Sequence, residues 1–251
     1  MDYMILLSVV LPIIAGGILL FLPDSAFADR KRLLKVTGVS FVVSALLAVC
    51  VISGAAGNRL VLFRLVDEIP VYFQIDALGR LFAGIVVLVF VLAGFFSFAY
   101  MSHEQHEKRY YGFYLVTFGV LMGLCFSGNL VTLYLFYELL TLVTFPLVLH
   151  YRNRESRAAS RKYLYYSIGG AAFAFMGLVF ILIYGNTADF ILGGVLNQGV
   201  PGFRTNTILF MYVLAFFGFG VKAALFPVHG WLPRASVAPT PVTALLHAVA
   251  V

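Results

Sequence analysis

Long apolar runs separated by short charged loops dominate the chain. A helix needs roughly 20 apolar residues to cross a bilayer, and seven runs are about that long, namely 3–22, 33–53, 78–100, 110–127, 130–150, 162–184 and 207–232. An eighth run begins near Pro241 and reaches Val251. The pattern predicts seven membrane-spanning helices and the start of an eighth.

Each end of this pattern leaves an alternative open. The eighth run rises only about 16 Å at 1.5 Å per residue, against a hydrocarbon core of about 30 Å. We therefore expect either a truncated sequence or a partner helix in another chain. The first run could be a signal peptide, but no basic residue precedes it, and it is longer than the apolar region of a typical signal. We predict a first span.

Composition supports a lipid environment. Of 251 residues, 62% are hydrophobic and 11% are charged, whereas soluble domains are about 45–50% apolar and about 25% charged. A soluble core cannot hide this much apolar surface, so we predict an all-α integral membrane protein. The net charge of +6 does not indicate a nucleic-acid partner, because the basic residues lie in short clusters between the apolar runs.

Lys and Arg are distributed unequally between alternate loops. One side of the predicted membrane receives twelve of the 17, the other receives three (Arg59, Arg64 and Arg204), and Arg80 and Lys222 lie within spans. The twelve are Arg30, Lys31, Arg32, Lys35, Lys108, Arg109, Arg152, Arg154, Arg157, Arg161, Lys162 and Arg234. Cytoplasmic loops carry an excess of basic residues. The bias predicts a multi-pass protein of the cytoplasmic (inner) membrane with its N-terminus outside.

Two loops have structure-forming patterns. The segments RLVLFRLV and VYFQID, between the second and third spans, alternate and are rich in Val, Phe and Tyr, which predicts a small external β-hairpin. The segment NTADFILGGVLNQG, between the sixth and seventh spans, predicts a short surface helix capped by Asn186 or Thr187.

A few ionisable residues lie inside the predicted spans, where such residues are rare and are candidates for function. Glu138 and Lys222 lie near the middle of the fifth and seventh spans, and His247 lies in the eighth run. Glu138 and Lys222 could form an ion pair that only fixes helix packing, although desolvation makes buried pairs poor sources of stability. His247 alone could equally be a hydrogen-bonded packing residue.

A helix break is predicted close to Lys222. Pro227 removes a backbone donor and crowds the preceding turn, and Gly218 and Gly220 loosen the same region. Broken helices beside an ionisable side chain recur in membrane transporters. Burial favours a neutral amine and a nearby carboxylate favours the charged one. We hypothesise that Glu138, by moving toward or away from Lys222, switches it between holding and releasing a proton.

Weaker candidates surround this pair. Tyr137 is expected to supply a hydrogen bond, and His229 and His150 are candidate proton relays, although His150 could merely cap a helix end. Trp231 is expected at the membrane interface. His103-Glu104-Gln105-His106 has metal-like spacing, but it lies in a charged loop with Glu107 and Lys108, which favours a solvated loop over a metal site. Cys50 and Cys125 occur singly, so we expect no disulfide, iron–sulfur cluster or other bound cofactor.

Two stretches carry a family resemblance. NLVTLYLFYELLTLVTFPLV (129–148) and KAALFPVHGWLPRASVAPTPVTALLHAVAV (222–251) resemble the antiporter-like subunits shared by complex I, multi-subunit sodium/proton antiporters and membrane-bound hydrogenases. Tyr137 stands where the family usually has Trp. The resemblance covers the whole chain and implies an antiporter-like fold: residues 1–109 supply three spans and the hairpin, and 110–251 supply the first of two inverted repeats, with its eighth span incomplete.

The resemblance also implies roles and partners. Glu138 would be the charge-pair glutamate, Lys222 the proton-carrying lysine, and His247 the relay toward the second repeat. The partners implied are other membrane subunits, further antiporter-like subunits among them, and redox subunits in other chains that would drive proton translocation. Two alternatives remain: a sodium/proton antiporter subunit without redox coupling, and a non-conducting membrane scaffold.

Overall fold

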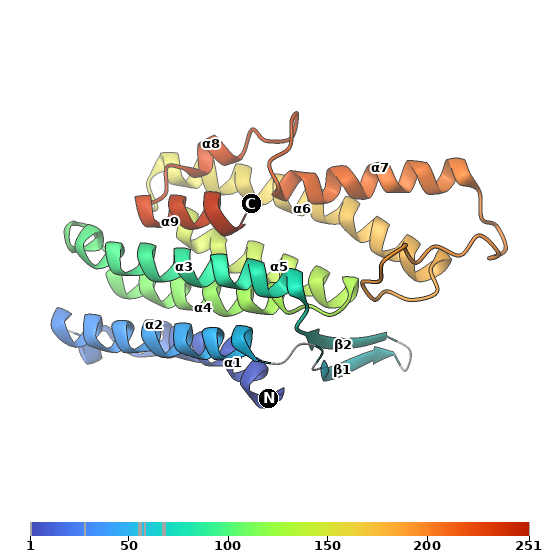
Figure 1. The fold of residues 1–251 in the computed structure, drawn as a ribbon. Coiled ribbons are helices and arrows are strands. Elements are labelled where there is room, and N and C mark those ends of the chain that lie inside the picture. Colours follow the sequence, from blue (N-terminus) through green and yellow to red (C-terminus); the bar gives the residue numbers. More distant parts are fainter. Residues whose placement is uncertain (1, 28, 55–56, 58, 67–68, 251) are drawn as a thin grey trace.

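The computed structural model describes residues 2–27, 29–54, 57, 59–66 and 69–250. Its main elements are helices with a two-stranded hairpin at one end of the bundle (Figure 1). In chain order they are α1 (Asp2–Phe21), α2 (Arg30–Ser53), β1 (Arg59–Val66), β2 (Ile69–Gln74), α3 (Ala77–Tyr100), α4 (Glu107–Cys125), α5 (Leu130–Val148), α6 (Arg154–Tyr184), α7 (Thr205–Lys222), α8 (Leu232–Ala235) and α9 (Thr240–Leu245). A single turn of π-helix, Leu246–Ala250, follows α9.

Six of the described helices are long and apolar enough to cross a membrane, judged by length and composition: α1, α2, α3, α5, α6 and α7. The remaining predicted span, 110–127, folds as α4, which is less apolar. Its tyrosines are buried within the protein, where Tyr114 donates to the carbonyl of Phe90 at 2.9 Å and Tyr111 to that of Ser97 at 3.3 Å. A helix surrounded by protein can carry such hydroxyls because neighbouring elements satisfy them.

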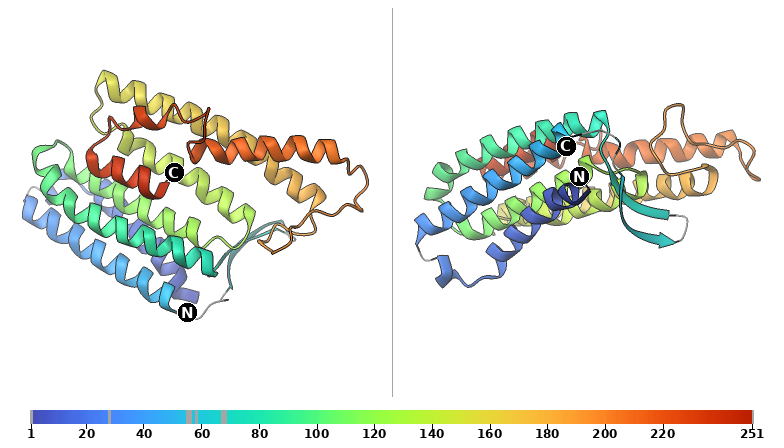
Figure 2. Two further views of the ribbon diagram at one scale, coloured as in Figure 1. Left: turned by 45° about the horizontal axis from the view of Figure 1, so that its top comes forward. Right: turned by 60° about the horizontal axis from the view of Figure 1, so that its bottom comes forward.

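The helices are stacked in layers, with α1 and α2 on one side, α6 and α7 on the other, and α3, α4 and α5 between them (Figures 1 and 2). Small residues permit the closest contacts. A Cβ atom added to Gly16 would lie 2.4 Å from the carbonyl oxygen of Gly112, and one added to Gly119 would lie 2.4 Å from that of Val9. The backbones of α1 and α4 therefore touch, as expected for small residues at membrane helix interfaces.

The predicted β-hairpin is confirmed. β1 and β2 pair antiparallel from Arg59↔Gln74 to Val66↔Ile69, with register shifts that mark bulges, and residues 67 and 68 between the two strands lie outside the described residues. Tyr72 of β2 donates its hydroxyl to Asp189 at 2.6 Å. The hairpin is thus fastened to the loop between α6 and α7.

The surface helix predicted after Asn186 is wrong. This segment forms turns and isolated bridges, Asn129↔Asp189 and Gly185↔Leu196. The Thr187 hydroxyl accepts from the backbone N–H of Asp189 at 3.1 Å, a local bond that turns the chain instead of starting a helix. Gly193 and Gly194, with φ of 91° and 88°, then adopt a left-handed conformation that a helix excludes.

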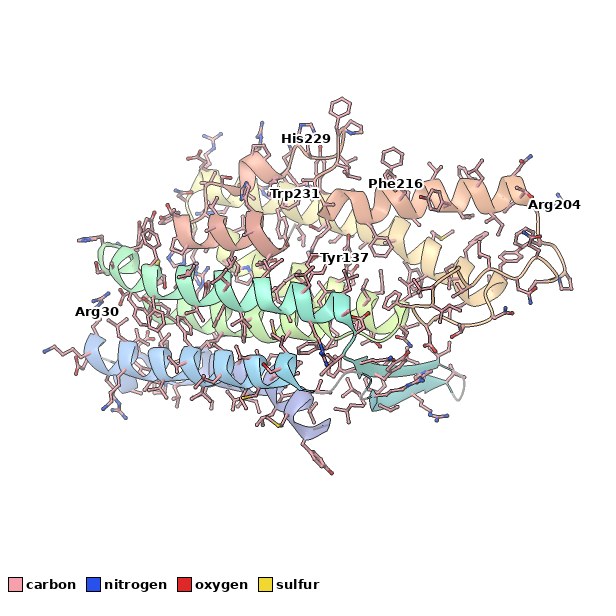
Figure 3. The ribbon with its side chains drawn as sticks, in the orientation of Figure 1. Arg30, Tyr137, Arg204, Phe216, His229 and Trp231 are labelled. Atoms are coloured by element: carbon pink, nitrogen blue, oxygen red, sulfur yellow. The ribbon has the colours of Figure 1, made fainter. Side chains whose placement is uncertain are left out.

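Charged loops lie at opposite ends of the bundle. Arg30, one of the twelve basic residues assigned to one side, and Arg204, one of the three assigned to the other, occupy opposite ends of the molecule (Figure 3). At the Arg30 end, Arg30 pairs with Glu107 at 2.9 Å and Lys108 with Asp24 at 2.5 Å. The alternation of loops inferred from the sequence is present in the fold, and which end faces the cytoplasm stays a prediction.

Candidate functional site

Lys222 is buried between three helices. It is the last residue of α7, and its side chain is only 7% exposed. Its Nζ donates to the Thr141 hydroxyl of α5 at 2.5 Å and lies 5.0 Å from the ring centre of Tyr137 and 5.9 Å from that of Tyr163. Oxygen acceptors and electron-rich ring faces both favour an ammonium ion over a neutral amine.

Glu138 lies on the same helix as Thr141, three residues earlier, so both side chains leave one face of α5. The ion pairs found among the described residues do not join its carboxylate to the Lys222 amine. The Oε1 atom of Glu138 is buried and has no hydrogen-bond partner in the described part of the chain. The structure brings the predicted pair to facing helices but leaves them unbonded.

The predicted helix break follows Lys222 directly. α7 ends there, Ala224 has a positive φ of 49°, and Pro227 lies in the irregular segment that leads to α8. Trp231 donates its indole N–H to the Val221 carbonyl at 2.7 Å, and Tyr137 donates its hydroxyl to the Gly218 carbonyl at 3.3 Å. Side chains therefore add donors to carbonyls near the end of α7, where the backbone N–H of Ala224 also bonds to the Val221 carbonyl at 3.1 Å.

The hydrogen bond from Trp231 to the end of α7 corrects the expectation that Trp231 anchors the chain at the membrane interface. The Trp231 side chain is 1% exposed and packs within the bundle, where Figure 3 shows it close to the end of α7. An indole has one donor, and a buried one needs an acceptor. The Val221 carbonyl at the end of α7 is that acceptor. The sequence indicated an interfacial position because Trp231 lies near the end of a predicted span.

Gly218 and Gly220 lie within α7 and not in the break. A Cβ atom added to Gly218 would lie 2.4 Å from the backbone nitrogen of Ala174, and one added to Gly220 would lie 2.8 Å from the Leu225 side chain. Gly218 therefore permits close packing of α7 against α6. Gly220 makes room for the chain that folds back after Lys222.

A cluster of hydroxyl groups beside Lys222 was not identified from the sequence. It consists of Thr141 and Thr144 of α5 and Tyr163 of α6. The Tyr163 and Thr144 hydroxyl oxygens lie 2.6 Å apart, and Thr144 donates to the Leu140 carbonyl at 2.6 Å. The signal was available, because Thr141 and Thr144 follow Glu138 at intervals of three residues and share its helix face.

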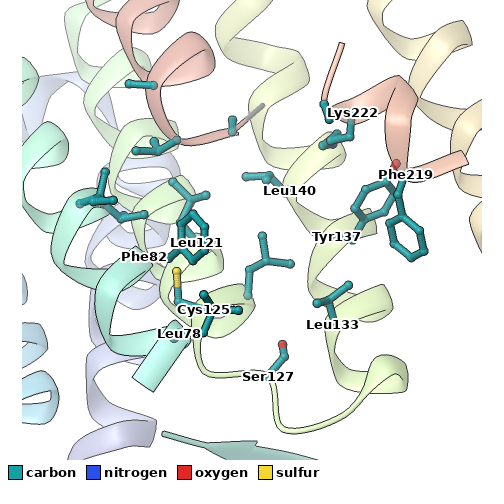
Figure 4. Close-up of a pocket in the computed structure, with 18 of the residues that line it drawn as sticks. Leu78, Phe82, Leu121, Cys125, Ser127, Leu133, Tyr137, Leu140, Phe219 and Lys222 are labelled. Atoms are coloured by element: carbon teal, nitrogen blue, oxygen red, sulfur yellow. The ribbon is translucent and has the colours of Figure 1, made fainter. Parts of the chain in front are cut away.

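A cavity of about 580 Å³ opens beside the Lys222 side chain. Figure 4 shows Lys222 at one end and Ser127 toward the other, with Leu133, Leu140 and Phe219 among the lining residues. Apart from Lys222, Asp76 and a few hydroxyls, the walls are apolar. Such surroundings strengthen any electrostatic interaction between Glu138 and Lys222.

The three candidate histidines occupy different environments. His247 is exposed, and its Nδ1 lies 2.8 Å from the Thr243 carbonyl of its own helix, so the structure does not join it to Lys222. His229 is exposed in the break, with its ring 5.7 Å from that of Phe226.

The described residues contain no group of three or more His, Cys, Asp or Glu placed to hold a metal.

His150 is buried, and its Nε2 lies 2.9 Å from the Gln105 carbonyl oxygen. Because a carbonyl only accepts, Nε2 carries the proton. Burial lowers the pKa of His150 to about 4, and the nearby charges of Arg109 and Arg152 act in the same direction. The ring is therefore neutral at pH 7 and ties two loops together, which favours its packing role over a relay.

Two protein-family models match the chain. Residues 127–251 match the transmembrane domain described as "NADH:quinone oxidoreductase/Mrp antiporter, TM", and residues 66–111 match "NADH-Ubiquinone oxidoreductase (complex I), chain 5 N-terminus". The matched regions contain the hairpin strand β2, Glu138, Lys222 and the helix break. The chain belongs to this family of antiporter-like membrane subunits.

Its relatives include both ion exchangers and quinone-reducing complexes. The chain is 32% identical over 83% of its length to a probable K⁺/H⁺ antiporter subunit of Rhizobium meliloti, covering 21% of that protein. It is 31% identical over 79% of its length to the chloroplast NAD(P)H-quinone oxidoreductase subunit 5 of Zygnema circumcarinatum, covering 29% of it. The chain thus spans less than a third of each of these relatives.

Solved structures share the fold. A chain of an archaeal membrane-bound sulfane sulfur reductase superposes with a TM-score of 0.74 at 23% identity, over 95% of this chain and 49% of that one. A chain of the Mrp complex of Dietzia sp. superposes with a TM-score of 0.76 at 19% identity, over 98% and 45%. Both belong to multi-subunit membrane complexes. The expected antiporter-like fold is confirmed, and the chain is a multi-pass membrane protein.

Proposed function

We propose that the chain transfers protons through the Glu138–Lys222 site within a multi-subunit, redox-driven membrane complex. The observation that carries the proton-transfer step is the buried Lys222 amine at the broken end of α7, which faces a carboxylate but is not bonded to it. Burial favours the neutral amine and a close carboxylate favours the ammonium. Changing their separation therefore loads and unloads a proton.

Redox drive would come from partner chains, as expected from the resemblance. The likeness to one chain of a quinone oxidoreductase and to one chain of a sulfane sulfur reductase complex supports this source of energy. A second candidate is an antiporter component that exchanges a cation for protons without redox chemistry. The identity of 32% to the K⁺/H⁺ antiporter protein of Rhizobium meliloti, and of 34% over 69% of this chain to a Na⁺/H⁺ antiporter protein of Alkalihalophilus pseudofirmus, supports it.

The decisive variant for proton transfer is Lys222→Ala in the full-length protein, assembled with its partners and measured in inverted membrane vesicles. We expect proton transport to fall to background while the complex assembles normally. Lys35→Ala is the matched control, because Lys35 is exposed on α2. Full transport by the Lys222→Ala complex would contradict the proposal and favour a non-conducting scaffold.

A second measurement separates the sources of energy. Vesicles that hold the wild-type complex are given a reductant, or a Na⁺ or K⁺ gradient, and the internal pH is followed. Redox-driven transport predicts acidification with reductant and little response to the cations. A response to a cation gradient without reductant would identify the antiporter alternative.

A further inference from the structure

The Lys222 amine contacts a hydroxyl group and two aromatic rings and is not paired with a carboxylate. It donates to Thr141 at 2.5 Å and faces the rings of Tyr137 and Tyr163, while Glu138 keeps a buried carboxylate oxygen without a partner among the described residues. A lysine with equal access to both would pair with the carboxylate, because an opposite charge is the stronger partner in an apolar site. The neighbouring hydroxyls must therefore compete with Glu138.

The protons of the Thr144 and Tyr163 hydroxyls can be assigned. Thr144 has one proton and donates it to the Leu140 carbonyl, which only accepts, so Tyr163 donates to Thr144. The Thr141 oxygen accepts from Lys222. The protons of Thr144 and Tyr163 are therefore donated to acceptors other than the amine.

This order has a chemical consequence. The chain of hydroxyls ends on a backbone carbonyl, which accepts a hydrogen bond but cannot take up the proton and pass it on. The cluster can therefore stabilise an ammonium ion without conducting its proton. The two tyrosine faces act in the same sense, since cations are attracted to aromatic rings.

We propose that Thr141, supported by Tyr163, is a positioning residue that forms a second docking position for the protonated Lys222 amine, in competition with Glu138. The inference rests on the proposed function and deepens it. The amine alternates between the carboxylate and the hydroxyl cluster, and the structure holds it at the cluster. The ionisable groups that face it are Glu138 and Tyr137 of α5 and Tyr163 of α6, with Asp76 and Cys125 at a distance along the same cavity.

The test is Thr141→Val, which keeps the shape of the side chain and removes the acceptor. With the second position lost, the protonated amine has only Glu138 to stabilise it, so it gives up its proton more readily. We expect the pH at which transport reaches half its maximum, on the acidic limb of the profile, to fall by about one unit, the tenfold effect of one hydrogen bond to a charged group. A structure of the variant complex should show the amine within ion-pair distance of Glu138.

Two further variants make the result specific. Thr141→Ser restores the hydroxyl and should restore the wild-type profile. Thr117→Val removes a buried threonine hydroxyl of α4 that bonds to the Phe113 carbonyl of its own helix, and should leave the profile unchanged. If Lys222→Ala abolishes transport but Thr141→Val keeps the wild-type profile and amine position, this inference fails and the proposed function stands. If Lys222→Ala transports normally, both fail.

Discussion

Buried tyrosines form two groups in this chain, one on α4 and one around Lys222. The same side chain has a different structural role in each group. On α4, Tyr114 stacks on Phe90 at 4.8 Å, and Phe90 stacks on Phe118 at 4.0 Å. Among the described residues, cations face the rings of other tyrosines instead: Tyr72, Tyr137, Tyr163 and Tyr166. The α4 group packs the N-terminal half together, whereas Tyr137 and Tyr163 surround a charge.

The difference lies in what each hydroxyl can reach. The Tyr114 hydroxyl donates to a carbonyl within a continuous helix, α3. The Tyr137 hydroxyl donates to a carbonyl in the last turn of a helix that stops at a lysine. We therefore expect a functional role for the buried tyrosines that lie beside an interrupted backbone and an ionisable group. Matched variants in the two regions should therefore behave differently.

The largest expected effect is that of Glu138→Gln compared with Glu107→Gln. Removing the Glu138 charge takes away the group that attracts Lys222, and we expect proton transport in assembled vesicles to fall by at least about tenfold. Glu107 pairs with Arg30 at the end of the bundle, where ion pairs contribute about 0–1 kcal/mol. Its variant should transport normally. Equal losses in both variants would show that Glu138 has no special role.

A smaller effect is expected for Tyr137→Phe compared with Tyr114→Phe. The first variant keeps the ring near Lys222 but removes the side-chain donor to the Gly218 carbonyl, and a hydrogen bond of about 1 kcal/mol corresponds to an approximately fivefold loss of transport. The second should cost about 1 kcal/mol of stability with no change in transport. Transport assays and thermal unfolding of the purified complexes distinguish the two outcomes, and a transport loss in Tyr114→Phe alone would reverse the assignment.

The smallest effect concerns His150, which packs between the two loops. Its pKa is about 4 in the folded chain and about 6.5 when unfolded, so between these values the unfolded state binds more protons. His150 therefore makes the protein less stable as the pH falls from about 6.5 to about 4, and contributes no pH dependence above that window. His150→Asn should flatten this part of the curve of unfolding midpoint against pH. Identical curves for both proteins would contradict the assigned burial.

Much of this arrangement was predictable because the bilayer leaves few solutions. A span needs about 20 apolar residues and cannot hide an ionisable group without a partner or a cavity. Those two constraints make Lys222 and Glu138 candidates for function from their positions in the predicted spans. The alternation that predicted the hairpin is equally local, since residues 59–74 carry it without help from the rest of the chain.

What escaped prediction depends on contacts between distant segments. Nothing in the sequence around Thr141 shows that the fold places Lys222 of α7 beside its hydroxyl. Likewise, nothing around Trp231 shows that its indole N–H lies 2.7 Å from the Val221 carbonyl at the end of α7. The segment after Asn186 has a helical start signal, but its backbone bonds go to Thr187 and to residues outside the segment. Local patterns do not contain such partners.

The hydrogen bond between the Trp231 indole and the Val221 carbonyl joins the two ends of residues 221–231 and so closes this segment into a loop. The part of this loop farthest from the bond is exposed and consists of Leu225, Phe226 and Pro227. Within it, the backbone N–H of Leu225 also donates to the Gly220 carbonyl at 2.9 Å. Inserting or deleting a residue in this segment should therefore shift the end of α7 together with the amine that it carries.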